Sequence, residues 1–252
     1  MVRKALKGRG NIQEKRPSRL AMTPDIMWLL KNKLAKSRLS LVKKRLIWAA
    51  ACTLFVGSLR SGETLPSNKL VFVKGATLLN KHISKETRYI NGSNRSFLRL
   101  FLEAPKEDRT GRGVEVELFE TVNFFCPVTA LQKWKEASSL SHLPDLPVFR
   151  LEDGAGYTAR ELNIDLKHLL EGEIDYSAGR TSTHSFRAGI TTTMARLGYS
   201  KEMISLQGRW RSDAYLNYCK LGRTNRLQDQ ARLMDDMAST ASSWISGGIL
   251  VH

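Results

Sequence analysis

Two short stretches in the C-terminal half combine cations with groups that can hydrogen-bond to a phosphate or attack it. Residues 183–189 place His184 and Arg187 three positions apart, on one face of a helix if the segment is helical. Residues 208–218 hold two arginines, a tryptophan and two tyrosines. Cations that gather on a phosphate, with a hydroxyl that can attack it, are the components of a metal-free phosphoryl-transfer site.

Each of these features also has an ordinary interpretation. His184 could be a surface residue and Arg187 a salt-bridged one, while Tyr215 and Tyr218 could both belong to the core by periodicity. In favour of a site, Ser182 or Thr183 is placed to cap the helix that His184 begins, and a helix N-terminus attracts anions.

The net charge favours a polyanionic partner. The 252-residue chain carries a formal charge of +16, and its first 45 residues contain 14 Lys and Arg against two acids, a net of +12. Such an excess favours nucleic acid first and an anionic membrane surface second. A solvated basic tail is the alternative, but the basic residues continue into an expected helix, so we expect an arm that follows phosphates and a double-stranded DNA partner.

Cysteine usage and hydropathy exclude several classes of protein. Cys52, Cys126 and Cys219 are far apart and lack C-x-x-C spacing, which argues against a disulfide framework and a zinc site. No signal peptide is visible, and the longest apolar run, 46–57, is too short to span a bilayer and is typical of a buried helix. We therefore expect an intracellular protein without a membrane partner, nuclear in a eukaryote.

Periodicity and turn residues predict a mainly α fold with one small antiparallel β-sheet (α+β). Thr23-Pro24-Asp25 resembles a helix start. The expected strands are 70–73, 97–102 and 114–118, and the turn-rich connector 105–113 makes the last two a hairpin. The expected helices are 23–35, 39–59, 129–138, 158–170, 184–197, 201–207, 212–220 and 225–237.

Taken in order, these elements resemble the catalytic domain of tyrosine recombinases, or phage-type integrases, with a pattern similar to the integrases of DIRS- and Crypton-type mobile elements. The resemblance covers roughly residues 15–222. Its motifs are Leu-Arg-Ser-Gly-Glu at 59–63, Lys-Glu-Asp at 106–108, His-Ser-Phe-Arg at 184–187, and Gly-Arg-Trp at 208–210 followed by Tyr218; segments 126–131 and 147–149 are also similar.

The resemblance implies a role for each motif residue. Tyr218 would be the nucleophile that forms a 3′-phosphotyrosyl link, and Lys106 would protonate the departing 5′ oxygen. Arg60 and Arg187 would bind the charge on the non-bridging oxygens, with help from His184. Because the arginines neutralise that charge and the covalent link stores the bond energy, the resemblance implies no metal, cofactor or ATP.

Several assignments stay open at this stage. Trp210 is our choice for the sixth catalytic position, but counting back strictly from Tyr218 would select Arg209 instead. Tyr215 is the alternative nucleophile, and a looser alignment would replace Lys106 by Lys74 or Lys81. Arg60 could also serve only to cap the carbonyl groups of the helix that precedes it.

The expected organisation is a basic lead-in over 1–22, the catalytic domain over 23–222 and a C-terminal helix and tail over 223–252. Members of the family usually carry a core-binding domain that 1–22 cannot supply, and they assemble as a tetrameric synapse on DNA, often through a C-terminal segment. The leading hypothesis is a site-specific DNA recombinase. The alternatives are a silent DNA-binding derivative of a mobile element and a type IB topoisomerase-like enzyme.

Overall fold

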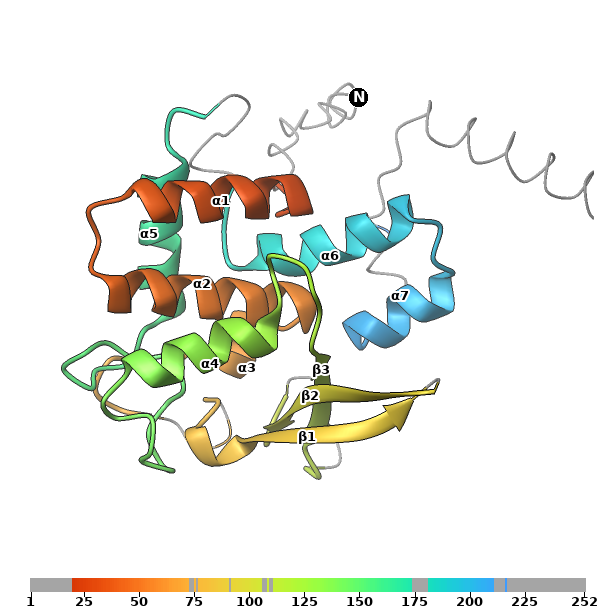
Figure 1. Ribbon diagram of the computed structural model, residues 1–252, viewed down its shortest axis with the longest axis horizontal. Coiled ribbons are helices and arrows are strands. Elements are labelled where there is room, and N and C mark those ends of the chain that lie inside the picture. The colour runs from red at the N-terminus through yellow and green to blue at the C-terminus, as the bar shows by residue number, and fades with distance from the viewer. Residues whose placement is uncertain are drawn as a thin grey trace, which may run out of the picture.

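The computed structural model describes residues 20–72, 75, 77–90, 92–105, 108, 111–173, 181–210 and 216. In these ranges helices predominate over strands, and a three-stranded sheet lies to one side of the helices (Figure 1). The elements are α1 (Pro24–Lys36), α2 (Leu41–Val56), α3 (Ser61–Thr64), η1 (Asn80–His82), β1 (Ile83–Ile90), β2 (Ser93–Leu102), β3 (Val114–Phe119), α4 (Pro127–Ala137), α5 (Ala159–Leu170), α6 (His184–Arg196) and α7 (Lys201–Gly208).

The core is built around α2. Its residues from Leu46 to Phe55, except Trp48, are all buried, because this helix is apolar on every side. Helices α1, α4 and α6 all contact it, and α5 packs on α1. The run 46–57 is therefore a buried helix, as the sequence predicts, and its C-terminal end is held from several sides.

The sheet has the order β1-β2-β3 and is antiparallel throughout. Leu98 pairs with Leu118 and Leu100 with Val116, and all four side chains are buried. The hairpin predicted from 97–102 and 114–118 is thus confirmed. Strand β1, which we did not predict, pairs with β2 along its whole length; its residues are mostly exposed, so its hydrophobic alternation is weak.

The predicted strand at 70–73 is wrong over its described residues, 70–72, which lie outside the sheet. The side-chain oxygen of Asn68 accepts hydrogen bonds from the backbone N–H groups of Leu70 and Val71, at 2.9 and 3.4 Å. This local turn occupies the donors that a strand would use. Leu70 is 83% exposed, so no core burial opposes the turn.

Helix starts largely follow the predicted signals. Thr158 caps α5 with a reciprocal bond to Glu161, and Pro24 opens α1. Thr23 and Thr183 occupy the N-cap positions of α1 and α6 but make no side-chain cap bond, so that part of the expectation is wrong. No helix in the described ranges has the length and apolar character needed to cross a bilayer.

A close backbone contact fixes α6 against the segment before α1. The Met22 N–H donates to the Ser185 carbonyl at 2.8 Å. A Cβ on Gly189 would lie 2.0 Å from the Met22 carbonyl oxygen, so this position requires glycine. The first turns of α6, which carry the His-x-x-Arg motif, are therefore held in place.

The expected helices 212–220, except Leu216, and 225–237 lie outside the described residues, as do residues 1–19. The proposed boundaries at 22 and 222 stay predictions.

Candidate active site

Arg60 stands at a sharp change in chain direction after α2. Ser58 adopts a left-handed conformation (φ +48°), and Arg60 then becomes the N-cap of the short helix α3. The Arg60 backbone N–H and guanidinium Nη1 donate to the two carboxylate oxygens of Glu63, at 3.1 and 2.9 Å. The Arg60 side chain keeps one fifth of its surface exposed, whereas the Glu63 side chain is 4% exposed.

Arg187 lies one turn into α6 and is 3% exposed. Its guanidinium donates to the Ser58 carbonyl at 2.9 Å and to the Gly208 carbonyl. These bonds join three segments of the chain: the end of α2, the start of α6 and the end of α7. Both of these acceptors are neutral carbonyl oxygens, so neither bond neutralises the guanidinium charge.

Trp210 connects the two arginines. The guanidinium carbon of Arg187 lies 4.1 Å from the indole centroid, and that of Arg60 lies 6.0 Å from it. The ring folds back over the end of α7 so tightly that a Cβ on Gly208 would lie 2.0 Å from the indole Nε1. Gly208 thus makes room for the tryptophan that faces both arginines.

Arg209 turns the opposite way. It is the C-cap of α7 in a left-handed conformation (φ +50°). Its guanidinium donates to the Gly57 carbonyl at 3.2 Å and to Glu63 Oε2 at 3.0 Å. At the two candidates for the sixth position, therefore, Trp210 packs against the arginines and Arg209 pairs with a carboxylate.

We call these five residues, Arg60, Glu63, Arg187, Arg209 and Trp210, the arginine cluster. It contains three guanidinium groups and one carboxylate, so the formal charges of these five residues sum to +2. Guanidinium groups that are partly exposed, as those of Arg60 and Arg209 are, can bind a phosphate through planar, charge-assisted hydrogen bonds. Two carbonyls at the end of α2, those of Val56 and Gly57, accept hydrogen bonds from the side chains of Gln207 and Arg209. Capping these carbonyls was the alternative role considered for Arg60.

His184 is the first residue of α6 and is exposed. The neighbouring Thr183 donates its hydroxyl proton to Ser61 Oγ at 2.8 Å, and its backbone N–H donates to Asn163. The start of α6 is therefore bonded to the residue that follows Arg60. Together with the bond from Arg187 to the Ser58 carbonyl, this contact holds the start of α6 beside the segment that carries Arg60.

Lys106, Tyr215 and Tyr218 lie outside the described residues, as does Lys74. Lys81, the other alternative to Lys106, forms an ion pair of 2.7 Å with Asp145, and this hydrogen bond raises the pKa of its amine. No group of three or more metal-binding side chains occurs in the part of the chain that the structure describes.

Sequence reasoning did not assign roles to Glu63 and Ser58. The capping pattern around Arg60 was a signal for Glu63, because an acid three positions after an N-cap accepts from the N-cap backbone. The left-handed conformation of Ser58 had no signal, since glycine is the usual residue there. The two described non-glycine residues with positive φ, Ser58 and Arg209, both contact the cluster or belong to it.

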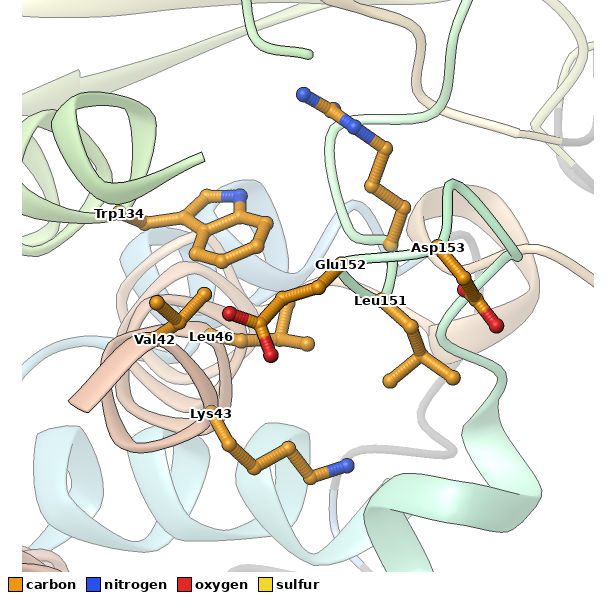
Figure 2. A pocket seen from close by; sticks show the side chains of 8 residues that line it. Val42, Lys43, Leu46, Trp134, Leu151, Glu152 and Asp153 are labelled. Atoms are coloured by element: carbon orange, nitrogen blue, oxygen red, sulfur yellow. The ribbon is translucent and has the colours of Figure 1, made fainter. Parts of the chain in front are cut away.

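A separate cavity of about 280 Å³ lies between α2 and the loop after Phe149. Figure 2 shows side chains of α2, among them Val42 and Lys43, on one side and Leu151 to Asp153 on the other. None of the arginine cluster lines it, so it is distinct from the candidate active site.

No protein-family model and no curated protein sequence matches this chain. Its fold, however, is similar to several solved structures. XerH site-specific recombinase, in a post-cleavage complex with a palindromic difH substrate, has a TM-score of 0.59 at 14% identity, covering 87% of this chain and 55% of its own. XerA recombinase has a TM-score of 0.53 at 15% identity, covering 85% of this chain and 65% of its own.

The Tn1549 transposon integrase (residues 82–397), in complex with circular intermediate DNA, has a TM-score of 0.52 at 13% identity, covering 87% of this chain and 67% of its own. This chain thus spans about half the length of the XerH chain. At these identities the likeness concerns the fold. The chain has the α+β fold of tyrosine recombinase catalytic domains.

Proposed function

We propose that the chain is a DNA strand-cleaving and strand-joining enzyme, a site-specific recombinase that acts through a tyrosine. The observation that carries this proposal is the meeting of Arg60, Arg187 and Trp210 in one positively charged cluster. These residues come from three distant segments, and they are the motif positions at which the sequence predicts phosphate binding. The fold supports the same class of enzyme.

In the proposed reaction the Tyr218 oxygen attacks a DNA phosphorus. A phosphotyrosyl bond to the 3′ strand forms, the bond to the 5′ oxygen breaks, and that oxygen leaves with a proton from Lys106. A 5′ hydroxyl of another strand then reverses the step and releases the tyrosine. His184 would accept the tyrosine proton or donate a hydrogen bond to the phosphate.

The arginines have unequal parts in this mechanism. Arg60, with one fifth of its side chain exposed, is the better placed to donate directly to a non-bridging oxygen. Arg187 is almost fully buried, and its bonds to two carbonyls fix its orientation beneath the indole of Trp210. It would act as a fixed positive charge, and its attraction for the phosphate would increase as water leaves the site, because the local dielectric constant falls.

The partner we propose is double-stranded DNA, to which the +16 charge is suited. We further propose a mobile-element setting of DIRS or Crypton type, assembly into a tetrameric synapse on DNA and, in a eukaryote, a nuclear location. These finer proposals depend on the motif resemblance and on the basic N-terminal segment.

The test uses a pool of nicked duplexes with a randomised centre, so that the target sequence need not be known and cleavage cannot reverse. We expect a protein–DNA band that survives denaturation, that is lost with Tyr218→Phe and that persists with Tyr215→Phe. Salt-sensitive DNA binding without a band in the wild type would refute strand cleavage and favour the silent DNA-binding derivative. Relaxation of supercoils by a monomer would favour the type IB topoisomerase-like alternative.

A further inference from the structure

Three aromatic rings meet at the surface where α1, α2 and the segment that joins β3 to α4 come together. In Figure 1 this segment rises from the sheet past α2 toward α1. The ring centroid of its Phe124 lies 5.1 Å from that of Trp28 on α1, edge to face, and 6.4 Å from that of Trp48 on α2. Trp28 is 51% exposed, although tryptophan is on average a largely buried residue. We call Trp28, Trp48 and Phe124 the aromatic patch.

The aromatic patch is supported from beneath by two further rings. Phe124 packs on Phe125 at 4.8 Å and Phe125 on Phe55 at 5.4 Å, both edge to face. Phe55 is fully buried in the last turn of α2, three residues before Ser58, which contacts the arginine cluster. Three ring contacts therefore join the exposed Trp28 to the helix end beside the candidate active site. A ring held in this way has little conformational freedom left to lose when it binds a partner.

Two lysines lie beside the aromatic patch, and neither has a carboxylate partner in the part of the chain that the structure describes. The Lys31 ammonium lies 5.6 to 6.0 Å from the centroids of all three rings. Lys44, four residues before Trp48 on α2, donates to the Ala35 carbonyl of α1 at 3.0 Å. Because Ala35 lies one turn beyond Lys31, both ammonium groups lie along one face of α1. The single acid of that helix, Asp25, is in its first turn.

We propose that the aromatic patch binds single-stranded DNA, with an unpaired base stacked on Trp28 and the neighbouring phosphates beside Lys31 and Lys44. Every base has a flat π-face that stacks on an aromatic ring, and nearby cations attract the backbone that carries the base. An apolar protein surface would also fit the rings. The two lysines without a counter-charge favour a polyanion instead.

The proposal deepens the proposed function and rests on it for the source of the unpaired strand. In a duplex the bases stack on one another, so a ring on the protein surface takes only a base that has left its stack. In the proposed reaction a 5′ hydroxyl from another strand attacks the phosphotyrosyl bond. That strand must first leave its own complement, and the aromatic patch would hold its unpaired bases.

The experiment separates stacking on a base from attraction to the backbone. Fluorescence anisotropy at constant ionic strength measures the affinity for an oligothymidine of about 16 nucleotides and for an abasic oligomer of equal length and charge. The wild type should bind the oligothymidine about tenfold more tightly than the abasic oligomer. Trp28→Ala should bind both with the affinity that the wild type has for the abasic oligomer. Trp28→Phe keeps a π-face and should keep the preference within about threefold.

Two further variants serve as controls. Tyr199→Ala removes a ring of similar exposure, 50%, from the connection between α6 and α7, and it should leave both affinities unchanged. Lys31→Gln should weaken the binding of both oligomers by the same factor and reduce the slope of log K against log salt by about 0.7. Thermal unfolding of each variant reports whether it is folded.

Equal affinity of the wild type for the two oligomers would overturn the proposal and leave the aromatic patch as a surface for a protein partner. A Trp28→Ala protein that keeps the preference would overturn it as well. If Trp28→Ala does not fold, Trp28→Leu replaces it. Leucine keeps an apolar contact with Phe124 but has no π-face, so this variant should also lose the preference.

The covalent-adduct assay distinguishes this proposal from strand cleavage. A preference for oligothymidine that depends on Trp28, without an adduct from the wild type, would support stacking and refute cleavage. An adduct from a wild type that binds the two oligomers equally would support cleavage and refute stacking.

Discussion

Replacing Gly208 by alanine should displace Trp210 from the arginine cluster. The new Cβ would lie 2.0 Å from the indole Nε1 and 2.2 Å from Cδ1. A tolerable contact begins near 3.4 Å, so the ring would have to move by about 1.4 Å, away from its place 4.1 Å from the Arg187 guanidinium. The methyl group is therefore incompatible with the present packing of the ring.

The magnitude follows from two opposing effects. Moving the ring loses a partly desolvated cation–π contact worth about 1–2 kcal/mol, and keeping it in place costs about 1–3 kcal/mol of overpacking. An unobstructed Gly→Ala change in a helix gains up to about 1 kcal/mol. We expect Gly208→Ala to lower the unfolding free energy by about 1–2 kcal/mol.

Gly62→Ala is the matched control. Gly62 also lies in a helix, α3, close to the same cluster, but a Cβ there would meet no atom within 4 Å. Urea unfolding of both variants should show a loss for Gly208→Ala and no loss for Gly62→Ala. Phosphate affinity should fall only in the former. A Gly208→Ala protein as stable as the wild type, with unchanged phosphate binding, would refute the packing of Trp210 described above.

Further changes have defined outcomes. Ser58→Gly should raise the unfolding free energy by about 1 kcal/mol, since it relieves a left-handed conformation, and thermal unfolding should show a midpoint about 2–4 °C higher. Tyr157→Phe should cost about 1–2 kcal/mol, because the phenol donates to Asp165, while the exposed Tyr199→Phe should change nothing in the same assay. Burial and the charge of Asp165 raise the pKa of Tyr157 well above its ordinary 10.0. The stabilisation by the protonated Tyr157 phenol is therefore complete below pH 10, and it is lost at higher pH as the phenol ionises in the unfolded chain. The free energy of unfolding, measured as a function of pH for the wild type and for Tyr157→Phe, gives this loss. If the basic segment binds about six to ten phosphates, log K for duplex DNA should fall with log salt at a slope of about −5 to −9, and a flat response would contradict the DNA partner.

Most of the helices were predictable because their starts and periodicity are local. Thr158 with Glu161 is a capping pattern that the structure confirms, and Pro24 begins α1. Strand β1 was missed because one long backbone pairing with β2 forms it, while its own residues are mostly exposed and show no hydrophobic alternation. Its sequence signal was the dipeptide Asn91-Gly92, which is typical of tight hairpins.

The predicted site residues include four of the five members of the arginine cluster, all except Glu63, but the motifs do not give its arrangement. The motifs identify Arg60 and Arg187, yet only the packing of α2, α6 and α7 buries Arg187 under Trp210. Glu63 accepts hydrogen bonds from both Arg60 and Arg209 because the chain reverses at two left-handed residues, Ser58 and Arg209. The spacing of the motifs does not predict these reversals. The assignments of Lys106 and Tyr218 stay predictions from the motifs.

The most direct test of the central claim is to identify the amino acid that carries the DNA. The adduct from the nicked duplex pool is digested with nuclease and trypsin, and cleavage after Arg211 and Lys220 places Tyr215 and Tyr218 in one peptide. Fragment masses between them assign the added nucleotide. We predict that it is on Tyr218, with a 3′ phosphate linkage, and that Arg60→Ala abolishes it. Nucleotide on another residue, or an undiminished adduct with Arg60→Ala, would contradict strand cleavage at the arginine cluster.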